Sequence, residues 1–539
     1  MVLPATSKNQ KIIFLIIFIL CLFVQIIPVI RSGLNYNYGI GFWGPNGHDG
    51  IWHLSLINHI SNPIKIDMPV FAGEALKNYH PFFDILIAYL SKITFIDSSI
   101  WLFQLFPIIS ASLFLYFSFL LGRKVSNSYS GGLILMILNA INNSFGWIVT
   151  LIRSGSFNGE SLFWAMQSPS NQLNPPFALS ILLLIVLIYL LKSPQPKKII
   201  IFLILILLPI IKVYSAVPAF IIFAFYVLKN KKYISTFVLS LIFATLLFFQ
   251  YNSASGSLIK FQPFWFTNSM IESVDRFYWP ELVSFLHSSN ILKFFIAEII
   301  AIIIFIVGNF AFRLIAFKEI FRDKAILFSV FVCFLIPTLF IQNGTSWNTI
   351  QFLYYALFLA NIPLSLFLSQ HKRVATFIII ISLLPLIGSF PNWLGKIPPT
   401  SISNNELSAL NFLKNQVSGT VLTYPYDAYL RNEYKQTPLP IYAYETSSYV
   451  AAYSRHLTFI EDEMNLENSG FDWRLRRQNS TDFFAQKNQY IDRGFLVNNQ
   501  IDYIYLPKIY VSKNPKFIPE MYLENVYENP EVIIYKVKR

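Results

Sequence analysis

Long apolar runs separated by short polar turns dominate the first 390 residues of the chain. The first run, residues 12–30, is long enough for a helix that crosses a bilayer core, which takes about 20 apolar residues. It lacks the short apolar core and small-residue cleavage site of a signal peptide, so we interpret it as a retained helix. The pattern predicts eleven membrane-spanning helices, over residues 12–30, 99–122, 131–152, 177–191, 199–213, 215–228, 233–250, 292–312, 325–341, 351–369 and 374–390.

One more apolar segment, residues 81–95, is shorter than these and is interrupted by Asp84 and Lys92. If it crossed the membrane, every later basic cluster would move to the opposite side. We therefore expect an amphipathic helix that lies in the outer interface. Long connections then fall on the outer side, including residues 31–98 and 153–176.

Composition and charge agree with a membrane protein. The chain is 55% hydrophobic and 13% charged, whereas soluble domains are about 25% charged. Residues 396–539 contain 16 Lys and Arg and 16 Asp and Glu, so the net charge of +13 belongs upstream, in short clusters such as 123–124, 229–232 and 313–324. By the positive-inside rule these clusters, and the N-terminus, lie in the cytoplasm. Nothing in this distribution indicates a nucleic-acid partner.

The tail, residues 396–539, differs from the membrane half. Residues 406–416 have the apolar spacing of a helix, and residues 419–424, 501–506 and 532–537 are short runs typical of strands. We predict a polytopic α-helical membrane domain, 1–395, followed by a soluble extracytoplasmic α/β or α+β domain, 396–539.

The motif Gly47-His48-Asp49-Gly50-Ile51-Trp52-His53-Leu54 follows the first span directly. Asp49 is open to two interpretations. It is a preferred residue for the N-cap of a helix that begins near Gly50. Alternatively, its carboxylate removes a proton from a substrate or holds a metal ion, with His53 one helical turn later on the same face. Four of the seven histidines, His48, His53, His59 and His80, lie in this outer loop.

Two further residues are candidates for contact with a substrate. Lys212, between Pro209 and Pro218, interrupts the apolar run 199–228, and charges at such depth usually face a partner or a cavity. It either extends from a helix end to lipid head groups or binds a lipid phosphate. Glu160, in the polar loop 153–176, is either a solvated loop residue or a second acid of the site.

Several short motifs resemble those of the GT-C superfamily of membrane glycosyltransferases, such as the dolichyl-phosphate-mannose mannosyltransferases. They are an acid soon after the first span, the element Tyr79-His80-Pro81-Phe82-Phe83, and the turn Gly122-Arg123-Lys124. The resemblance, which assigns no subfamily, implies inverting transfer of a sugar from a polyprenyl-phosphate donor to a glycan, lipid or protein acceptor. It implies Asp49 as the catalytic base and His53, His80, Lys212 and Glu160 as substrate-binding residues.

The sequence departs from the superfamily pattern in one respect. Gly50 and Ile51 follow Asp49, where the superfamily often has a second acid, so a divalent metal stays an open expectation without assigned ligands. The resemblance implies a cell-envelope enzyme in a prokaryotic plasma membrane. The alternative is a non-catalytic transporter or assembly factor for lipid-linked saccharides, because such a protein would share the same apolar pattern.

Overall fold

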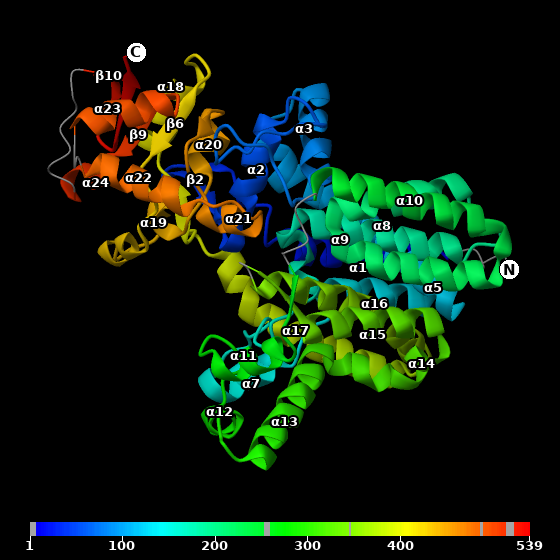
Figure 1. The fold of residues 1–539 in the computed structure, drawn as a ribbon. Coiled ribbons are helices and arrows are strands. Elements are labelled where there is room, and N and C mark those ends of the chain that lie inside the picture. Colours follow the sequence, from blue (N-terminus) through cyan, green and yellow to red (C-terminus); the bar gives the residue numbers. More distant parts are fainter. Residues whose placement is uncertain (1–6, 253–258, 344–345, 486–488, 514–521, 539) are drawn as a thin grey trace. The chain divides into compact units, whose positions relative to one another are not determined.

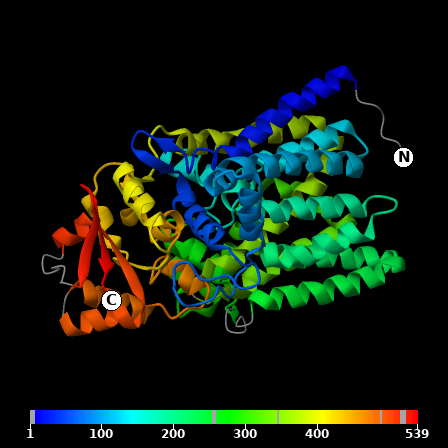
Figure 2. The ribbon, with the colours of Figure 1, turned by 90° about the horizontal axis from the view of Figure 1, so that it is seen from above.

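The computed structural model describes residues 7–252, 259–343, 346–485, 489–513 and 522–538. Its elements form two compact units (Figures 1 and 2). Unit 1 consists of residues 1–28 and 107–394, and unit 2 consists of residues 29–106 and 395–539. One unit boundary falls near residue 395, and the first outer loop belongs to the same unit as the tail.

Unit 1 is built from apolar helices, several of which lie side by side in both views (Figures 1 and 2). A helix satisfies its backbone hydrogen bonds internally, which a chain in hydrocarbon must do. The helices are α1 (Lys8–Ile26), α5 (Phe106–Ser126), α6 (Tyr129–Ile141), α7 (Gly146–Ser154), α8 (Pro175–Leu191), α9 (Lys198–Lys229), α10 (Ile234–Tyr251), α11 (Trp265–Glu272), α12 (Pro280–Leu286), α13 (Ile291–Phe310), α14 (Phe317–Arg322), α15 (Lys324–Leu339), α16 (Gln351–Gln370) and α17 (Lys372–Leu394). A strand pair, β3 (Ile259–Phe261) with β4 (Phe340–Gln342), completes it.

Each segment predicted to span the membrane contains a helix. By length and composition, seven helical segments among the described residues could cross a bilayer, or eight if α6 and α7, bent by 50°, form one span. Two shorter apolar helices, α8 and α15, come in addition. The helix α3 (Phe82–Thr94), which corresponds to the segment expected at the interface, is not among the candidate spans in the described part of the chain.

Helix α9 reverses its direction at Lys212, where the backbone is non-helical (φ −163°, ψ 102°). A straight helix of this length, 32 residues, would hold its ends about 48 Å apart at about 1.5 Å per residue. Instead, the Tyr233 hydroxyl donates a hydrogen bond to the Pro196 carbonyl (2.9 Å), and the Lys198 Nζ lies 5.4 Å from the centroid of the Tyr233 ring. Because these contacts join the two ends of α9, its halves form a hairpin with Lys212 at the tip. The prediction of two apolar segments divided at this lysine is confirmed.

Arg313 does not lie in an exposed basic turn, as its cluster in the sequence suggested. It is buried in a 3-10 helix after α13, η6 (Ala311–Ala316). Its Nε donates to the Leu357 carbonyl and to Asn361 Oδ1, both at 3.0 Å, and its Nη1 donates to Gln167 Oε1 at 3.1 Å. A buried cation is tolerated only when its donors are satisfied, so Arg313 belongs to the internal polar network of unit 1.

Unit 2 contains a five-stranded sheet in the order β10-β11-β9-β6-β8. Strands β10 (Leu523–Glu528), β11 (Val532–Val537) and β9 (Ile501–Pro507) pair antiparallel, while β9, β6 (Thr420–Thr423) and β8 (Leu457–Thr458) pair in parallel. Three of these strands and the helix α18 (Asn404–Lys414) lie where the sequence predicted them. The expected sheet-containing C-terminal region is confirmed.

A second sheet in unit 2 explains why the first outer loop belongs with the tail. Its order is β1-β2-β5-β7, and β2 (Gly39–Phe42) pairs antiparallel with β5 (Thr400–Ile402). The loop also carries the helix α2 (Asp49–His59), and α2 packs on α20 (Tyr449–Ser454) of the tail. The remaining elements are β1 (Asn35–Tyr36), α4 (Ser98–Ile100), β7 (Leu439–Pro440), α19 (Ile441–Tyr444), α21 (Glu463–Asn468), α22 (Arg474–Phe484), α23 (Gln489–Asn498) and α24 (Lys508–Lys513).

Candidate active site

Asp49 is the first residue of α2, and its position depends on a tight approach of the backbone to a neighbouring ring. A 3-10 turn, η1 (Gly44–Gly47), leads into the helix, and His48 occupies the N-cap position. A Cβ at Gly50 would lie 2.6 Å from the Phe103 ring, so only glycine fits there. The expectation that Asp49 is the N-cap is wrong, but a carboxylate in the first turn is still stabilised by the helix dipole.

His48 links two carboxylates that are more than 400 residues apart in the sequence. Its Nδ1 lies 2.8 Å from Asp49 Oδ1, and its Nε2 lies 3.1 Å from Asp462 Oδ1. The imidazole and the Asp462 side chain are buried, whereas 51% of the Asp49 side chain is exposed. Asp49 is therefore held in place on one side and accessible on the other.

The charges around His48 determine its protonation. Burial alone would lower the pKa of His48, but the charge and hydrogen bonds of Asp462 and Asp49 outweigh burial and hold that pKa well above its usual range. An imidazolium has two N–H donors, one for each carboxylate. The group formed by His48, Asp49 and Asp462, which we call the carboxylate–imidazolium triad, is thus a cation between two anions.

Glu445 stands beside this triad. Burial raises the pKa of Glu445; the charge of His48, and more weakly that of Arg431, lowers this pKa, while the charges of Asp49 and Asp462 raise it. Its carboxylate is half-buried and forms no hydrogen bond or ion pair among the described residues. A carboxyl group with a raised pKa in such a place is a candidate for contact with a substrate.

His53 has a different partner from the one that helical spacing suggests. Its Nδ1 lies 2.7 Å from Asp84 Oδ1 in α3, and both side chains are buried. The Tyr79 hydroxyl lies 3.4 Å from the same nitrogen and accepts a hydrogen bond from the Trp52 indole. These contacts fasten α2 to α3. His80, half-buried, stacks on the Tyr79 ring with centroids 5.0 Å apart.

Glu160 lies in unit 1, in the loop between α7 and the 3-10 helix η3 (Ser168–Leu173). Its carboxylate accepts hydrogen bonds from the Gln167 N–H (2.8 Å) and the Ser170 hydroxyl (2.9 Å). Burial raises its pKa to about 7. Glu160 lines a polar cavity with about 530 Å³ of empty space, together with Asn143 and Trp393.

Lys212 is buried at the tip of the α9 hairpin. Its Nζ lies 3.4 Å from Asn174 Oδ1, at the N-cap of α8, and 5.6 Å from the centroid of the Tyr214 ring. The preceding half of α9, residues 198–211, rises only about 21 Å, which is less than the bilayer core of about 30 Å. The Asn174 side-chain oxygen and the Tyr214 ring therefore both lie beside the ammonium group at the tip of the hairpin.

The donor arrangement around the triad does not fit a metal ion. In the part of the chain that the structure describes, no group of three or more His, Cys, Asp and Glu side chains has the geometry to hold one. Asp49 Oδ1 and Asp462 Oδ1 are each hydrogen-bonded to a ring nitrogen of His48. We therefore assign no step to a metal.

Sequence reasoning missed the role of Asp462, Glu445 and Asp84. The acidic run 461–463 and the three arginines Arg474, Arg476 and Arg477 stand close together in the tail. In the structure Arg476 stacks on Phe71 at 3.6 Å, and Arg477 pairs with Glu463. No local signal marks the partner of His48, because the contact with Asp462 joins the first outer loop to the tail. The partner of His53, Asp84, lies in the same loop but 31 residues further along the chain.

No protein-family model matches the chain, and no curated protein matches it. Among solved structures, the chain is similar to an oligosaccharyltransferase of Archaeoglobus fulgidus in complex with Zn and sulfate. The two are 13% identical, the match covers 97% of this chain and 73% of that chain, and the TM-score is 0.48. It is similar to AglB of the same organism, in complex with an inhibitory peptide and a dolichol-phosphate (10% identity, 93% and 70% covered, TM-score 0.40). A third similar structure is ArnT of Cupriavidus metallidurans bound to undecaprenyl phosphate (11% identity, 98% of both chains covered, TM-score 0.39). Similarity at this level leaves the function to be argued from this chain's own residues.

Proposed function

We propose that the chain is a membrane glycosyltransferase that moves a sugar from a polyprenyl-phosphate donor to an acceptor on the extracytoplasmic face. The observation that carries the proposal is the carboxylate–imidazolium triad, in which Asp49 is held by His48 yet half exposed. A general base must be fixed in place and still reach the proton that it removes. Asp49 satisfies both conditions.

The proposed reaction is a single displacement. The acceptor hydroxyl oxygen attacks the anomeric carbon, a new C–O bond forms, and the bond from that carbon to the phosphate oxygen breaks. The bonding electrons leave with the phosphate, which stays on the polyprenyl carrier. Asp49 takes the hydroxyl proton, and His48, bonded to Asp462 on its other side, keeps the carboxylate oriented.

Other side chains are assigned to binding. Lys212 is proposed to bind the phosphate of the donor, because it carries a buried ammonium group at the tip of the α9 hairpin, and charges at such depth usually face a cavity or a partner. Glu160, beside its polar cavity, is proposed to bind substrate hydroxyls. His80 is proposed to contact the substrate. His53, which is paired with Asp84 of α3, is proposed to hold α2 in position.

The proposed setting is a prokaryotic plasma membrane, with the N-terminus in the cytoplasm and unit 2 outside. Single cysteines test this topology: a label that cannot cross the membrane should reach Ser61→Cys, at an exposed position of the first outer loop, from outside and Ser126→Cys only from the cytoplasm. Labelling of both from the same side would contradict it.

The activity is tested in proteoliposomes that contain the full chain and polyprenyl-phosphate donors with a radiolabelled sugar. Acceptors extracted from bacterial envelopes are added, and label is followed from lipid to acceptor. The wild-type chain should transfer label, and Asp49→Asn should lose at least 99% of the rate, since base catalysis contributes about 10²–10⁴-fold. Asp97→Asn is the matched control, because Asp97 is an exposed helix cap in unit 2 and Asn caps equally well.

The same experiment separates the enzyme from a non-catalytic carrier. A transporter or assembly factor would bind the donor lipid but leave the sugar on it in every variant. Full transfer by Asp49→Asn would also contradict the proposal, because another group would then supply the base.

A further inference from the structure

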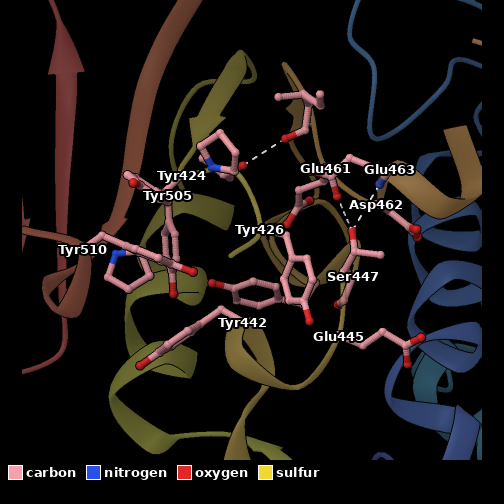
Figure 3. Close-up of a pocket in the computed structure, with 16 residues that line it drawn as sticks. Tyr424, Tyr426, Tyr442, Glu445, Ser447, Glu461, Asp462, Glu463, Tyr505 and Tyr510 are labelled. Carbon is pink, nitrogen blue, oxygen red and sulfur yellow. Dashed lines mark hydrogen bonds between the residues drawn. The ribbon is translucent and has the colours of Figure 1, made fainter. Parts of the chain in front are cut away.

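A pocket in unit 2 adjoins the carboxylate–imidazolium triad. It lies between the end of β6, the segment 442–449, the acidic run 460–463 and the end of β9. The space between these segments is about 460 Å³, part of which is open to solvent. Figure 3 shows Glu445 and Asp462 on one side, next to a blue helix from the N-terminal part of the chain, and Tyr442, Tyr505 and Tyr510 on the other.

Tyrosine rings supply the apolar surface of the pocket. Six tyrosines line it, and three of them, Tyr424, Tyr426 and Tyr442, are only half-buried, so parts of their rings are open to a ligand. Tyr510 stacks behind Tyr424 with centroids 4.0 Å apart, which fixes that ring. Tyrosine offers a flat apolar face and a polar edge on a stiff side chain, and a sugar ring matches this with C–H groups on its faces and hydroxyls at its rim.

The carboxylates of the pocket differ in what they already bind. Glu461 accepts the N–H groups of Val450 and Ala451, both at 3.0 Å, and Glu463 is paired with Arg477. Asp462 is bonded to His48 and to the amide of Asn465. Glu445 has no such bond among the described residues. It is the acid of the pocket that is left to accept hydrogen bonds from a ligand.

Ser447 is a second polar group without a protein partner. Its side chain lines the pocket, the residue is 8% exposed, and its hydroxyl forms no hydrogen bond among the described residues. A buried hydroxyl in that condition is unfavourable until something bonds to it. Glu445 accepts hydrogen bonds and Ser447 both donates and accepts, so the two suit a ligand that carries several hydroxyls.

The charges of the lining residues make the polyprenyl-phosphate donor an unsuitable ligand for this pocket. None of the residues that line the pocket is Lys or Arg, whereas four of them are Glu or Asp. No side chain of the lining therefore supplies a positive charge for a phosphate. Ile460 is the one aliphatic chain in the lining apart from two prolines, so the pocket offers little surface for a polyprenyl tail.

Two residues connect the pocket to the proposed base. Asp462 lines the pocket and bonds His48, which in turn bonds Asp49. Glu445 lines the pocket and feels the charges of Asp49 and His48. We propose that this pocket binds a sugar residue of the acceptor, so that the acceptor is a saccharide or a glycoconjugate; this inference rests on the proposed transfer reaction and names the class of its second substrate.

Binding is tested on the full chain in lipid nanodiscs by saturation-transfer difference NMR. The probes are the methyl glycosides of glucose, galactose, mannose and N-acetylglucosamine, with n-butylammonium and trialanine for comparison. At least one glycoside should bind to the wild-type chain and to Asp49→Asn alike, because binding does not require the base. Absence of glycoside binding, or binding of n-butylammonium or trialanine alone, would overturn the proposal.

Two variants and a matched control locate the binding. Tyr426→Ala should weaken glycoside binding at least tenfold; its backbone carbonyl still accepts the Arg477 hydrogen bond, so the segment keeps its anchor. Glu445→Gln should weaken binding without removing any contact of the fold. Tyr429→Ala removes the same ring from a site that is 80% exposed and outside the pocket, and should bind as the wild type does. Wild-type binding by both pocket variants would refute the assignment.

The outcomes for the pocket and for the activity can be told apart. Glycoside binding without sugar transfer by the wild-type chain would refute the proposed activity. Transfer by the wild-type chain, with an unchanged KM for the acceptor in Tyr426→Ala and Glu445→Gln, would refute the pocket alone.

Discussion

Replacing Asp462 by Asn tests the carboxylate–imidazolium triad without disturbing the fold. Asp462 has a left-handed backbone (φ 52°) and caps α21 through a hydrogen bond from Asn465 N–H. Asn is favoured at both kinds of position, so Asp462→Asn should fold. What it loses is the negative charge next to His48 Nε2.

The size of the effect follows from the lost interaction. A hydrogen bond to a charged group contributes about 1.5–3 kcal/mol, and each 1.4 kcal/mol is tenfold in rate or affinity. If that interaction orients the base, kcat for sugar transfer should fall about 10-fold to 100-fold in Asp462→Asn. The KM for the donor should change little, because the carrier phosphate is proposed to bind elsewhere, at Lys212.

The pH profile distinguishes this role from a general loss of structure. Asp462 is the stronger of the two carboxylates that raise the pKa of His48, so in Asp462→Asn that pKa falls. The imidazolium, present below its pKa, then loses its proton at a lower pH than in the wild type. Rates measured from pH 5.5 to 9.5 should show the alkaline limb moved to lower pH. An alkaline limb in its wild-type place, with kcat within twofold, would refute the role given to the triad.

Three other variants test separate parts of the account. Lys212→Met should raise the KM for the polyprenyl-phosphate donor at least tenfold, because it removes a hydrogen bond to a charged group, which contributes about 1.5–3 kcal/mol. Lys192→Gln, which changes an exposed lysine, should leave this KM as it is, and an unchanged KM in Lys212→Met would remove Lys212 from the phosphate site. Burial raises the pKa of Glu406 to about 8 from an ordinary 4.5, so this side chain binds its proton more tightly in the folded state than in the unfolded state. The melting temperature should therefore fall as pH rises from 4.5 to 8, and it should fall less in Glu406→Gln. Asp84→Asn should lower the free energy of unfolding of unit 2 by about 1–3 kcal/mol, the cost of an impaired buried hydrogen bond, and a variant as stable as the wild type would contradict the role of the His53 pair.

The membrane half was predictable because its signal is local. An apolar run of sufficient length forms a helix whichever segments pack against it. Lys212, a charged residue that interrupts such a run, marks the place where α9 reverses its direction. Strands β6, β9 and β11 were found in the same way, from short apolar runs. Arg313 was missed because burial depends on which acceptors surround it, and Asn361 and Gln167 come from distant segments.

The site was predictable only in its local part. Asp49 and its neighbour His48 stand together in the sequence, but the third member, Asp462, is brought by the packing of the first outer loop on the tail. Helical spacing placed His53 on the face of Asp49, yet Asp84 of α3 binds His53 instead. Sequence periodicity shows which side chains share a face and cannot show which partner that face meets.

Chemical rescue tests most directly whether Asp49 is the base. Asp49→Ala removes the carboxylate, and because the side chain is half exposed in the wild type, a small acid such as formate can enter the space. The rate of sugar transfer by Asp49→Ala is measured with formate from 0 to 1 M and with chloride at equal ionic strength. If Asp49 is the base, the rate is below 1% of wild type, rises with formate and does not rise with chloride. A rate near that of the wild type without formate would contradict it.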